Sequence, residues 1–223
     1  MMPKSELYNL IVLTIIYLTI FTVTEWFYIK TKTKAEHTRK FIHISCGLIS
    51  LTYVILFNTI WPVIIITSAF ALLLYSTKKL NYLNSIHNIT RESYGSYLFP
   101  ITILFCFSAY LYFDNSIYYY LPFIIMVLSD PIAAIVGSKY PIKRYKSGKE
   151  YKSIGGSLAF FISASLISYF MLLIILKINT PEIIFYSAII AGVSTFFEGL
   201  SKNGVDNILI PISIVITIFI LNF

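Results

Sequence analysis

Charged residues are scarce in this sequence: Asp, Glu, Lys and Arg together make up 12% of its 223 residues. A typical soluble domain carries about 25% charged residues, so the composition excludes a soluble globular domain. Hydrophobic residues reach 57% and the mean hydropathy is +0.79, which excludes a disordered chain as well. The sequence therefore predicts an integral membrane protein.

Cysteine is almost absent, and both cysteines, Cys46 and Cys106, fall inside apolar stretches. A disulfide-stapled module or a cysteine metal site would need more cysteines or further ligands nearby. Both residues are therefore predicted to be small, buried hydrophobic side chains.

Long apolar stretches fill most of the chain. A transmembrane helix needs about 20 such residues, so eight helices leave no room for a separate soluble domain. The first stretch is too long for the core of a signal peptide and is predicted to be retained. We predict one domain, residues 1–223, folded as an all-α bundle of seven to eight transmembrane helices. The stretches cover residues 7–27, 41–57, 60–76, 97–113, 117–136, 157–178, 183–199 and 206–222.

Basic residues are divided unequally between the predicted loops. Fifteen of the 17 Lys and Arg residues lie in or beside the loops after the first, third, fifth and seventh stretches, whereas Lys4 and Lys177 lie on the other side. Because basic loops stay in the cytoplasm, these four loops are predicted to be cytoplasmic. Topology and attraction to anionic membrane lipids then account for the net charge of +7. Nucleic acid is excluded as a partner, since the chain has no soluble basic face.

Three carboxylates at the predicted membrane edge are harder to explain by topology. Asp130 and Glu198 lie near the ends of apolar stretches, and Asp206 lies just before the last one. Ionisable groups at this depth are costly and are usually functional. Transporter sites usually lie near the bilayer midplane, whereas these three residues share one face, which favours an enzyme over a small transporter.

Two basic clusters lie on the same predicted face. Arg39 and His43 are four residues apart and so share one side of the predicted second helix. Lys40 lies beside Arg39 at the start of the same helix. The cluster fits a plain positive anchor with a satisfied histidine, or an anion site at a helix N-terminus, where free N–H groups favour phosphate. Arg91 and Glu92 form a weaker cluster that is typical of a simple cap.

A glycine-rich segment follows Asp130. A Gly-Gly pair with flanking Lys and Ser at a helix start is a reasonable phosphate cradle, although no strand precedes it as in a P-loop. Asn207, beside Asp206, fits an ordinary helix cap. The candidate nucleotide-binding residues of the segment are Gly137, Lys139, Lys152, Ser153, Gly155, Gly156 and Ser157.

Together these residues predict one chemistry. Oxygen ligands beside Lys and Arg are what a nucleotide–Mg²⁺ complex requires, and the apolar remainder suits a lipid acceptor. The residues alone predict phosphoryl or nucleotidyl transfer to a lipid at the cytoplasmic interface. The helices are then expected to converge on one cavity, bounded by Arg39, Asp130, Lys152, Glu198 and Asp206.

Five motifs, in order, resemble the polyprenol kinase superfamily, which groups dolichol kinase, phytol kinase and the CTP-dependent diacylglycerol kinase. The resemblance runs over most of the chain, from Arg39 to Pro211. One departure is Gly155, which stands where the family usually has a glutamate and so leaves the nucleotide preference open. The motifs are Arg39-Lys40-x-x-His43, Arg91-Glu92-x-x-Gly95, Asp130-x-x-Ala133-x-x-x-Gly137, Lys152-Ser153-x-x-Gly156-Ser157 and Glu198 followed by Asp206-Asn207-x-x-x-Pro211.

The resemblance implies a CTP-dependent kinase for a polyprenol, phytol or geranylgeraniol, or diacylglycerol, with Mg²⁺ as cofactor and ATP accepted by some members. A CTP:lipid-phosphate cytidylyltransferase is the alternative enzyme, although the long acidic signature of that class is absent. By position, the resemblance implies catalytic roles for Arg39, Lys40, Asp130 and Asp206, with Asp130, Glu198 and Asp206 as metal ligands. Either Asp206 or Glu198 is expected to accept the proton of the hydroxyl.

Overall fold

The structure is a computed structural model that describes residues 3–89, 93–147, 150–177 and 181–223. Two of the predicted site residues, Arg91 and Glu92, lie outside the described residues.

Helices make up nearly all of the fold, as predicted. Seven segments are long and apolar enough to cross a membrane, and α11 is a shorter apolar helix. These features fit an integral, multi-pass membrane protein and confirm the predicted helical bundle. The helices are α1 (Lys4–Thr31), α2 (Ala35–Ser50), α3 (Tyr53–Leu56), α4 (Trp61–Lys79), α5 (Asn84–His87), α6 (Gly95–Phe113), α7 (Ile117–Ile124), the π-helical turn η1 (Ile125–Ser129), α8 (Asp130–Lys139), α9 (Ile154–Ile175), α10 (Glu182–Leu200) and α11 (Asp206–Ile220).

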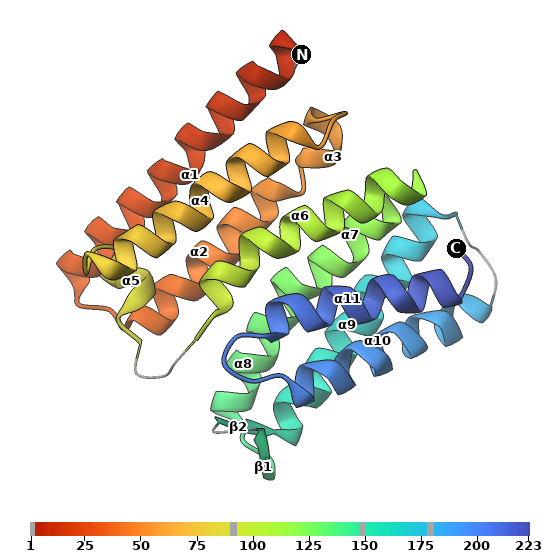
Figure 1. The fold of residues 1–223 in the computed structure, drawn as a ribbon. Coiled ribbons are helices and arrows are strands. Elements are labelled where there is room, and N and C mark those ends of the chain that lie inside the picture. The colour runs from red at the N-terminus through yellow and green to blue at the C-terminus, as the bar shows by residue number, and fades with distance from the viewer. Residues whose placement is uncertain (1–2, 90–92, 148–149, 178–180) are drawn as a thin grey trace.

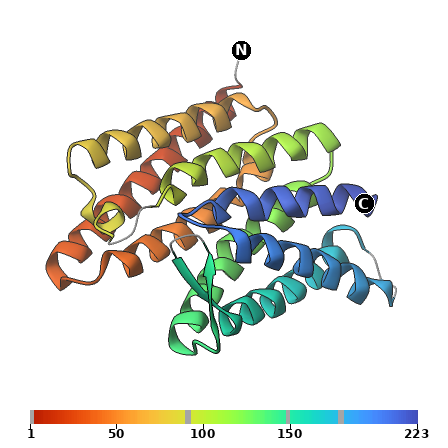
Figure 2. The ribbon, with the colours of Figure 1, turned by 60° about the horizontal axis from the view of Figure 1, so that its bottom comes forward.

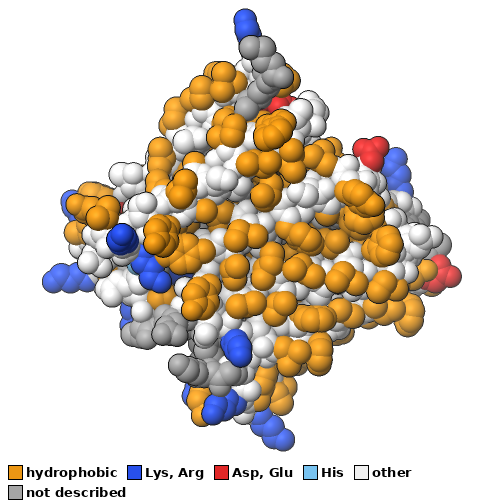
Figure 3. All heavy atoms as spheres, viewed as in Figure 1, with side chains coloured by type: hydrophobic (Ala, Val, Ile, Leu, Met, Phe, Trp, Pro, Cys, Tyr) orange, Lys and Arg blue, Asp and Glu red, His pale blue; other side chains and the backbone are white. Residues whose placement is uncertain are grey.

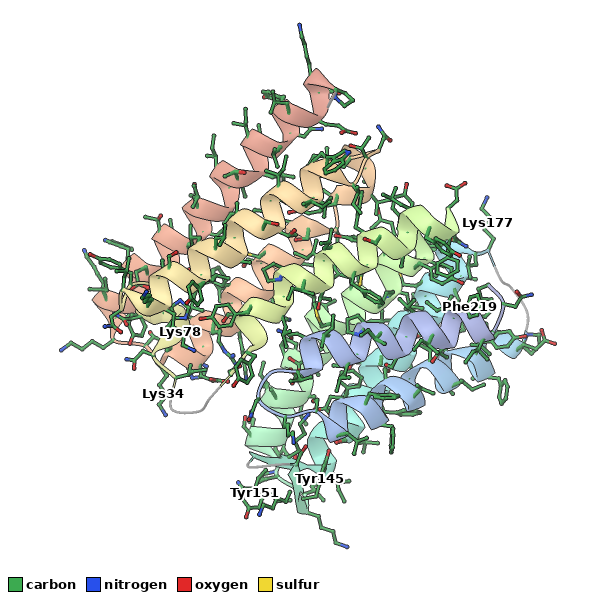
Figure 4. The ribbon with its side chains drawn as sticks, viewed as in Figure 1. Lys34, Lys78, Tyr145, Tyr151, Lys177 and Phe219 are labelled. Carbon is green, nitrogen blue, oxygen red and sulfur yellow. The ribbon has the colours of Figure 1, made fainter. Side chains whose placement is uncertain are left out.

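Successive long helices alternate in direction, so that the basic connections gather at one end of the bundle (Figure 1). We call this the basic end; of the described residues, it carries 32–34, 80–89, 93–94, 140–147, 150–153 and 201–205. Lys34 and Lys78 lie there, and Lys177 lies at the opposite end (Figure 4). The predicted partition of basic residues is therefore present in the fold.

The outer surface of the bundle is apolar over a wide area (Figure 3). On α9, exposed and buried side chains lie on opposite sides of the helix, as the helical repeat requires. Because soluble proteins rarely expose so large an apolar surface to water, the exposed side of α9 is suited to contact with lipid. The exposed residues are Leu158, Ile162, Leu166, Phe170 and Ile174, and the buried ones are Phe160, Ala164, Ser168 and Leu172.

The sequence did not predict two features at and beside the basic end. A short antiparallel hairpin, β1 (Arg144–Ser147) and β2 (Glu150–Ser153), joins α8 to α9 (Figure 2). In addition, η1 interrupts the long helix between Ile117 and Lys139 immediately before Asp130. Pro131 explains this turn, because proline has no N–H for the carbonyl four residues earlier and its ring crowds that carbonyl.

Both cysteines are buried and unpaired, as predicted. Cys106 is fully buried in the apolar core and Cys46 is 6% exposed.

Candidate functional site

A cavity of about 720 Å³ lies where the helices meet at the basic end. One part of its wall, which we call the polar side, comes mainly from α2, α8, α9, α11 and the hairpin. The other part, the apolar side, comes from α1, α2, α4, α5 and α6. The polar side includes Arg39, Lys40, His43, Asp130, Lys152, Ser153, Glu198, Asp206 and Asn207, and the apolar side consists of Phe21, Ile42, Cys46, Leu74, Ile86 and Phe99.

Most of the predicted site residues line this one cavity, including five that are far apart in the chain: Arg39, Asp130, Lys152, Glu198 and Asp206. Gly137, Gly156 and Ser157 line it too. Two predicted residues, Lys139 and Gly155, are not part of the wall.

The two excluded residues have other surroundings. Lys139 is exposed, and its ammonium group lies 5.5 Å from the ring centroid of Tyr140. A Cβ atom at Gly155 would lie 2.5 Å from the carbonyl oxygen of Tyr140. Because that contact is with a backbone atom, a glutamate at position 155 would not fit without moving the chain around Tyr140. Gly155 therefore serves a close backbone contact in this structure.

An ion pair joins the end of β2 to the end of α10. The Lys152 ammonium donates to Glu198 Oε1 at 2.5 Å and to Ser201 Oγ at 2.9 Å, and it also contacts the backbone carbonyl of Glu198. The two side chains are only 15% and 7% exposed. Glu198 Oε2 is buried and has no hydrogen-bond partner among the described residues. The pair thus fixes Lys152 in the wall and leaves one carboxylate oxygen unused.

Asp130 begins α8 directly after the π-helical turn. It is half-buried, and it lines the cavity within electrostatic range of Arg39, Lys152, Glu198 and Asp206. π-helical turns are frequent at functional sites because they shift the side chains that follow them. The geometry therefore puts this carboxylate in one cavity with two cationic groups and two other carboxylates.

Arg39 projects from the first turns of α2. Its Nη1 donates to Ser93 Oγ at 2.9 Å, and its Nη2 donates to Glu36 Oε1 at 3.3 Å. The guanidinium group is 19% exposed. These contacts hold the group at the cavity wall, where its planar fork suits phosphate oxygens.

The start of α6 is tied to the start of α11. Asn207 Nδ2 donates to the backbone carbonyl of Gly95 at 2.8 Å, and the Thr102 hydroxyl donates to the carbonyl of Asn207 at 2.5 Å. Gly204 has φ of 81°, and a Cβ atom there would lie 2.5 Å from the Gly95 nitrogen. Only glycine meets both conditions. Asn207 therefore has a structural role: its hydrogen bonds to α6 hold the start of α11, and with it the neighbouring Asp206, in position.

The start of α9 is capped by the side chain of Ser153. Ser153 Oγ accepts from the Gly156 N–H at 3.1 Å, and the Ile154 N–H donates to the carbonyls of Ile142 and Lys143. These two N–H groups are already satisfied, so the predicted phosphate cradle has fewer free donors than its sequence suggests.

Helices α8 and α9 approach closely through glycine. A Cβ atom at Gly156 would lie 2.9 Å from the Ala133 carbonyl oxygen and 3.2 Å from the Gly137 Cα. Small residues permit such close packing between membrane helices. The contact sets the spacing between Asp130 on α8 and Lys152 before α9.

A metal site built from protein ligands alone is not present: within the described part of the chain, no three His, Cys, Asp or Glu side chains are grouped closely enough to hold a metal ion. The assignment of Asp130, Glu198 and Asp206 as metal ligands stays a prediction, and Glu198 is paired with Lys152 in this structure. The remaining donors still fit Mg²⁺, which usually takes one or two carboxylates together with substrate phosphates.

The cavity wall also includes Arg144 and Tyr151, which the sequence analysis did not predict as site residues. Both belong to the hairpin and are exposed, and the wall also includes Lys152 of the same hairpin. Tyr145 holds the hairpin in place, because its hydroxyl group lies 2.7 Å from Ser157 Oγ. Alternating Tyr and Ser in residues 144–153 is a strand signal that could have predicted this element.

A comparison with curated proteins finds a phytol kinase from Synechocystis sp. that is 25% identical over 178 residues, covering 80% of this chain and 76% of the relative. This similarity supports a relationship to phytol kinases at the level of the family. No protein-family model matches the chain. No solved structure matches it either.

Proposed function

We propose that this protein is a CTP-dependent kinase that phosphorylates the hydroxyl group of a membrane lipid alcohol. The observation that carries the proposal is the cavity itself, because it combines carboxylate and basic groups on one side with an apolar wall on the other. An amphipathic substrate with a reactive polar head fits such a cavity. The similarity to a phytol kinase supports kinase activity in general.

The proposed reaction is a direct phosphoryl transfer. The lipid hydroxyl oxygen attacks the γ-phosphorus, the bond from that phosphorus to the bridging oxygen breaks, and the products are a lipid phosphate and CDP. Such a transfer makes little covalent demand on the protein, so positioning and charge stabilisation provide most of the catalysis. When bound, Mg²⁺ would neutralise charge on the phosphates, and Asp130 would hold it together with the phosphate oxygens.

The basic residues would bind the phosphates. Arg39, Lys40 and Lys152 line the same cavity as the carboxylates. Lys152 is held in one position by Glu198, so it needs little reorganisation when a phosphate arrives.

Asp206 is the better candidate for the base that accepts the hydroxyl proton. Its Oδ1 accepts from the Asn207 N–H at 3.1 Å, which fixes the side chain, and it is half-buried in the wall. Glu198, the other candidate from the sequence, is already bound to Lys152.

The proposal also places the basic end at the cytoplasmic face, where nucleotides are made and where basic loops remain. The lipid alcohol would enter from the bilayer, and its hydroxyl group would travel only to headgroup depth.

The test is a transfer assay with purified protein in lipid nanodiscs. CTP or ATP labelled in the γ-phosphate is supplied with Mg²⁺ and a panel of polyprenols, phytol, geranylgeraniol and diacylglycerol. We expect a labelled lipid phosphate and CDP in equal amounts. With a lipid phosphate supplied in place of the alcohol, release of labelled pyrophosphate together with a CDP-lipid would show cytidylyl transfer instead. No transfer from either nucleotide to any lipid alcohol would overturn the proposal.

A further inference from the structure

A second, smaller pocket lies beside the apolar side of the cavity. This inner pocket has a volume of about 40 Å³, and none of its open surface is polar. Four residues of the apolar side, Phe21, Cys46, Leu74 and Phe99, line both spaces. The inner pocket is completed by Tyr17, Ser50, Tyr53, Ile66, Thr67, Phe70, Pro100 and Ile103.

Polar side chains such as Tyr17 and Ser50 also line the inner pocket, but they are hydrogen-bonded to one another. The Tyr17 hydroxyl lies 2.8 Å from Ser50 Oγ, and the Tyr119 hydroxyl donates to the Ser50 carbonyl at 2.6 Å. Ser50 Oγ also donates to the Cys46 carbonyl at 2.8 Å. Since these groups satisfy each other, the lumen presents only apolar surface to an occupant.

One side of α2 connects the two spaces. Arg39, His43, Cys46 and Ser50 follow each other at helical spacing, and all four line the main cavity or the inner pocket. From Arg39 to Ser50 the helix rises about 16 Å. Along this distance the wall changes from a phosphate-binding cation to the apolar inner pocket.

We propose that the hydrocarbon chain of the lipid alcohol lies along this side of α2, with its hydroxyl group near Asp206 and its distal part directed into the inner pocket. The proposal rests on the proposed function and narrows it to one substrate class. A pocket of about 40 Å³ has room for about three water molecules, or for the end of one chain. The proposal therefore predicts that a single-chain alcohol is used in preference to a glyceride, whose second chain has no place in the inner pocket.

Leu74 lies where the two spaces adjoin, so that its size would set the width of the passage that the proposal requires. It lies on α4, is 5% exposed and lines both of them. Leu72, two residues earlier, is 66% exposed on the outer surface of the same helix. A phenylalanine at position 74 would narrow the passage, whereas the same change at position 72 adds a ring on the lipid-facing side.

The first experiment compares Leu74→Phe with Leu72→Phe across single-chain alcohols of increasing length and a diacylglycerol. We expect Leu74→Phe to lower kcat/KM at least tenfold for the longest alcohol that the wild type uses, and less than twofold for the shortest. The KM for the nucleotide should not change, and Leu72→Phe should match the wild type throughout. Equal losses on all alcohols, or turnover of diacylglycerol by the wild type as fast as that of the single-chain alcohols, would overturn the proposal.

A second experiment needs no turnover. A long-chain alcohol with a photoreactive diazirine at its distal end is added to the protein in nanodiscs without nucleotide, and the labelled peptides are mapped. Labelling of Thr67 or Phe70 on α4 supports the proposal, and labelling confined to outer residues such as Leu72 overturns it. If the transfer assay fails with every alcohol, the proposed function is wrong, and this labelling still decides whether the pocket binds a lipid chain.

Discussion

The polar and apolar sides of the cavity are held in place by different means. On the polar side, hydrogen bonds join segments that are far apart in the chain: Lys152 binds Glu198, and Asn207 binds the Gly95 carbonyl. On the apolar side, the wall is made by packed side chains such as Phe21 and Leu74. A transfer reaction needs fixed atoms, whereas a hydrocarbon chain needs only a space of the right width.

This difference implies different outcomes for substitutions on the two sides. A change on the polar side should lower turnover for every lipid alcohol. A change on the apolar side, such as Leu74→Phe, should alter which alcohol is used. The following substitutions test the polar side, from the largest expected effect to the smallest.

Asp130→Asn should cause the largest loss of activity. The substitution keeps the shape of the side chain but removes the charge that would face Mg²⁺ and the phosphates, so we expect turnover to fall about 1,000-fold. The unfolding temperature in detergent should stay within a few degrees of the wild type. Asp114→Asn is the matched control, because Asp114 is exposed at the end of α6, away from the cavity. If Asp130→Asn keeps more than about a tenth of wild-type turnover, Asp130 does not have this role.

Lys152→Met should lower both stability and activity. The substitution leaves Glu198 buried without its cation, and breaking such a pair costs about 3–5 kcal/mol. The second change, Glu198→Gln, should restore most of the stability but not the activity, because the phosphates still lack a cation. Thermal unfolding of the wild type, both single variants and the double variant measures the coupling. Stability losses that simply add would show that the pair is not coupled.

Arg39→Lys should reduce kcat/KM for the nucleotide about 10- to 100-fold. An ammonium group keeps the charge, but it cannot bind two phosphate oxygens with a planar fork or keep both contacts to Ser93 and Glu36. Steady-state kinetics with varied nucleotide measures the effect. Wild-type kinetics would mean that Arg39 is only a positive anchor of α2.

Gly156→Ala should have the smallest effect. A methyl group there meets the backbone of Ala133 and Gly137, so α8 and α9 must move apart, at a cost of about 1–3 kcal/mol. Gly192→Ala is the matched control, since a Cβ atom at Gly192 meets nothing within 4 Å. The control should equal or exceed the wild type in thermal stability. Equal thermal stability of the two variants would show that α8 and α9 do not depend on the close contact at Gly156.

The all-helical bundle and the alternation of its long helices could be predicted from the sequence, whereas the helix ends could not: α2 begins at Ala35 and not at residue 41. Hydropathy and the distribution of Lys and Arg depend on local composition, which a single sequence contains. The meeting of Arg39, Asp130 and Asp206 at one cavity followed from the same topology, because all three lie at the same ends of their helices.

Other features depend on contacts that local patterns do not specify. The pairing of Lys152 with Glu198 joins residues 46 positions apart, and the sequence assigned one to a nucleotide and the other to a metal. The inner pocket was missed because apolar residues such as Phe70 and Ile103 carry no sign of whether they fill space or surround it. The π-helical turn follows from the effect of Pro131 on the carbonyl four residues earlier. Helical periodicity alone does not predict it.

The central claim is that nucleotide and lipid alcohol meet in one cavity at the basic end. The most direct measurement is an electron cryo-microscopy structure of the protein in nanodiscs with Mg²⁺, a non-hydrolysable CTP analogue and a single-chain alcohol. The account predicts the γ-phosphate beside Arg39 and Asp130, the hydroxyl group near Asp206, and the chain passing Leu74 toward Ser50. A nucleotide bound elsewhere, or an alcohol bound only on the outer surface of the bundle, would contradict it.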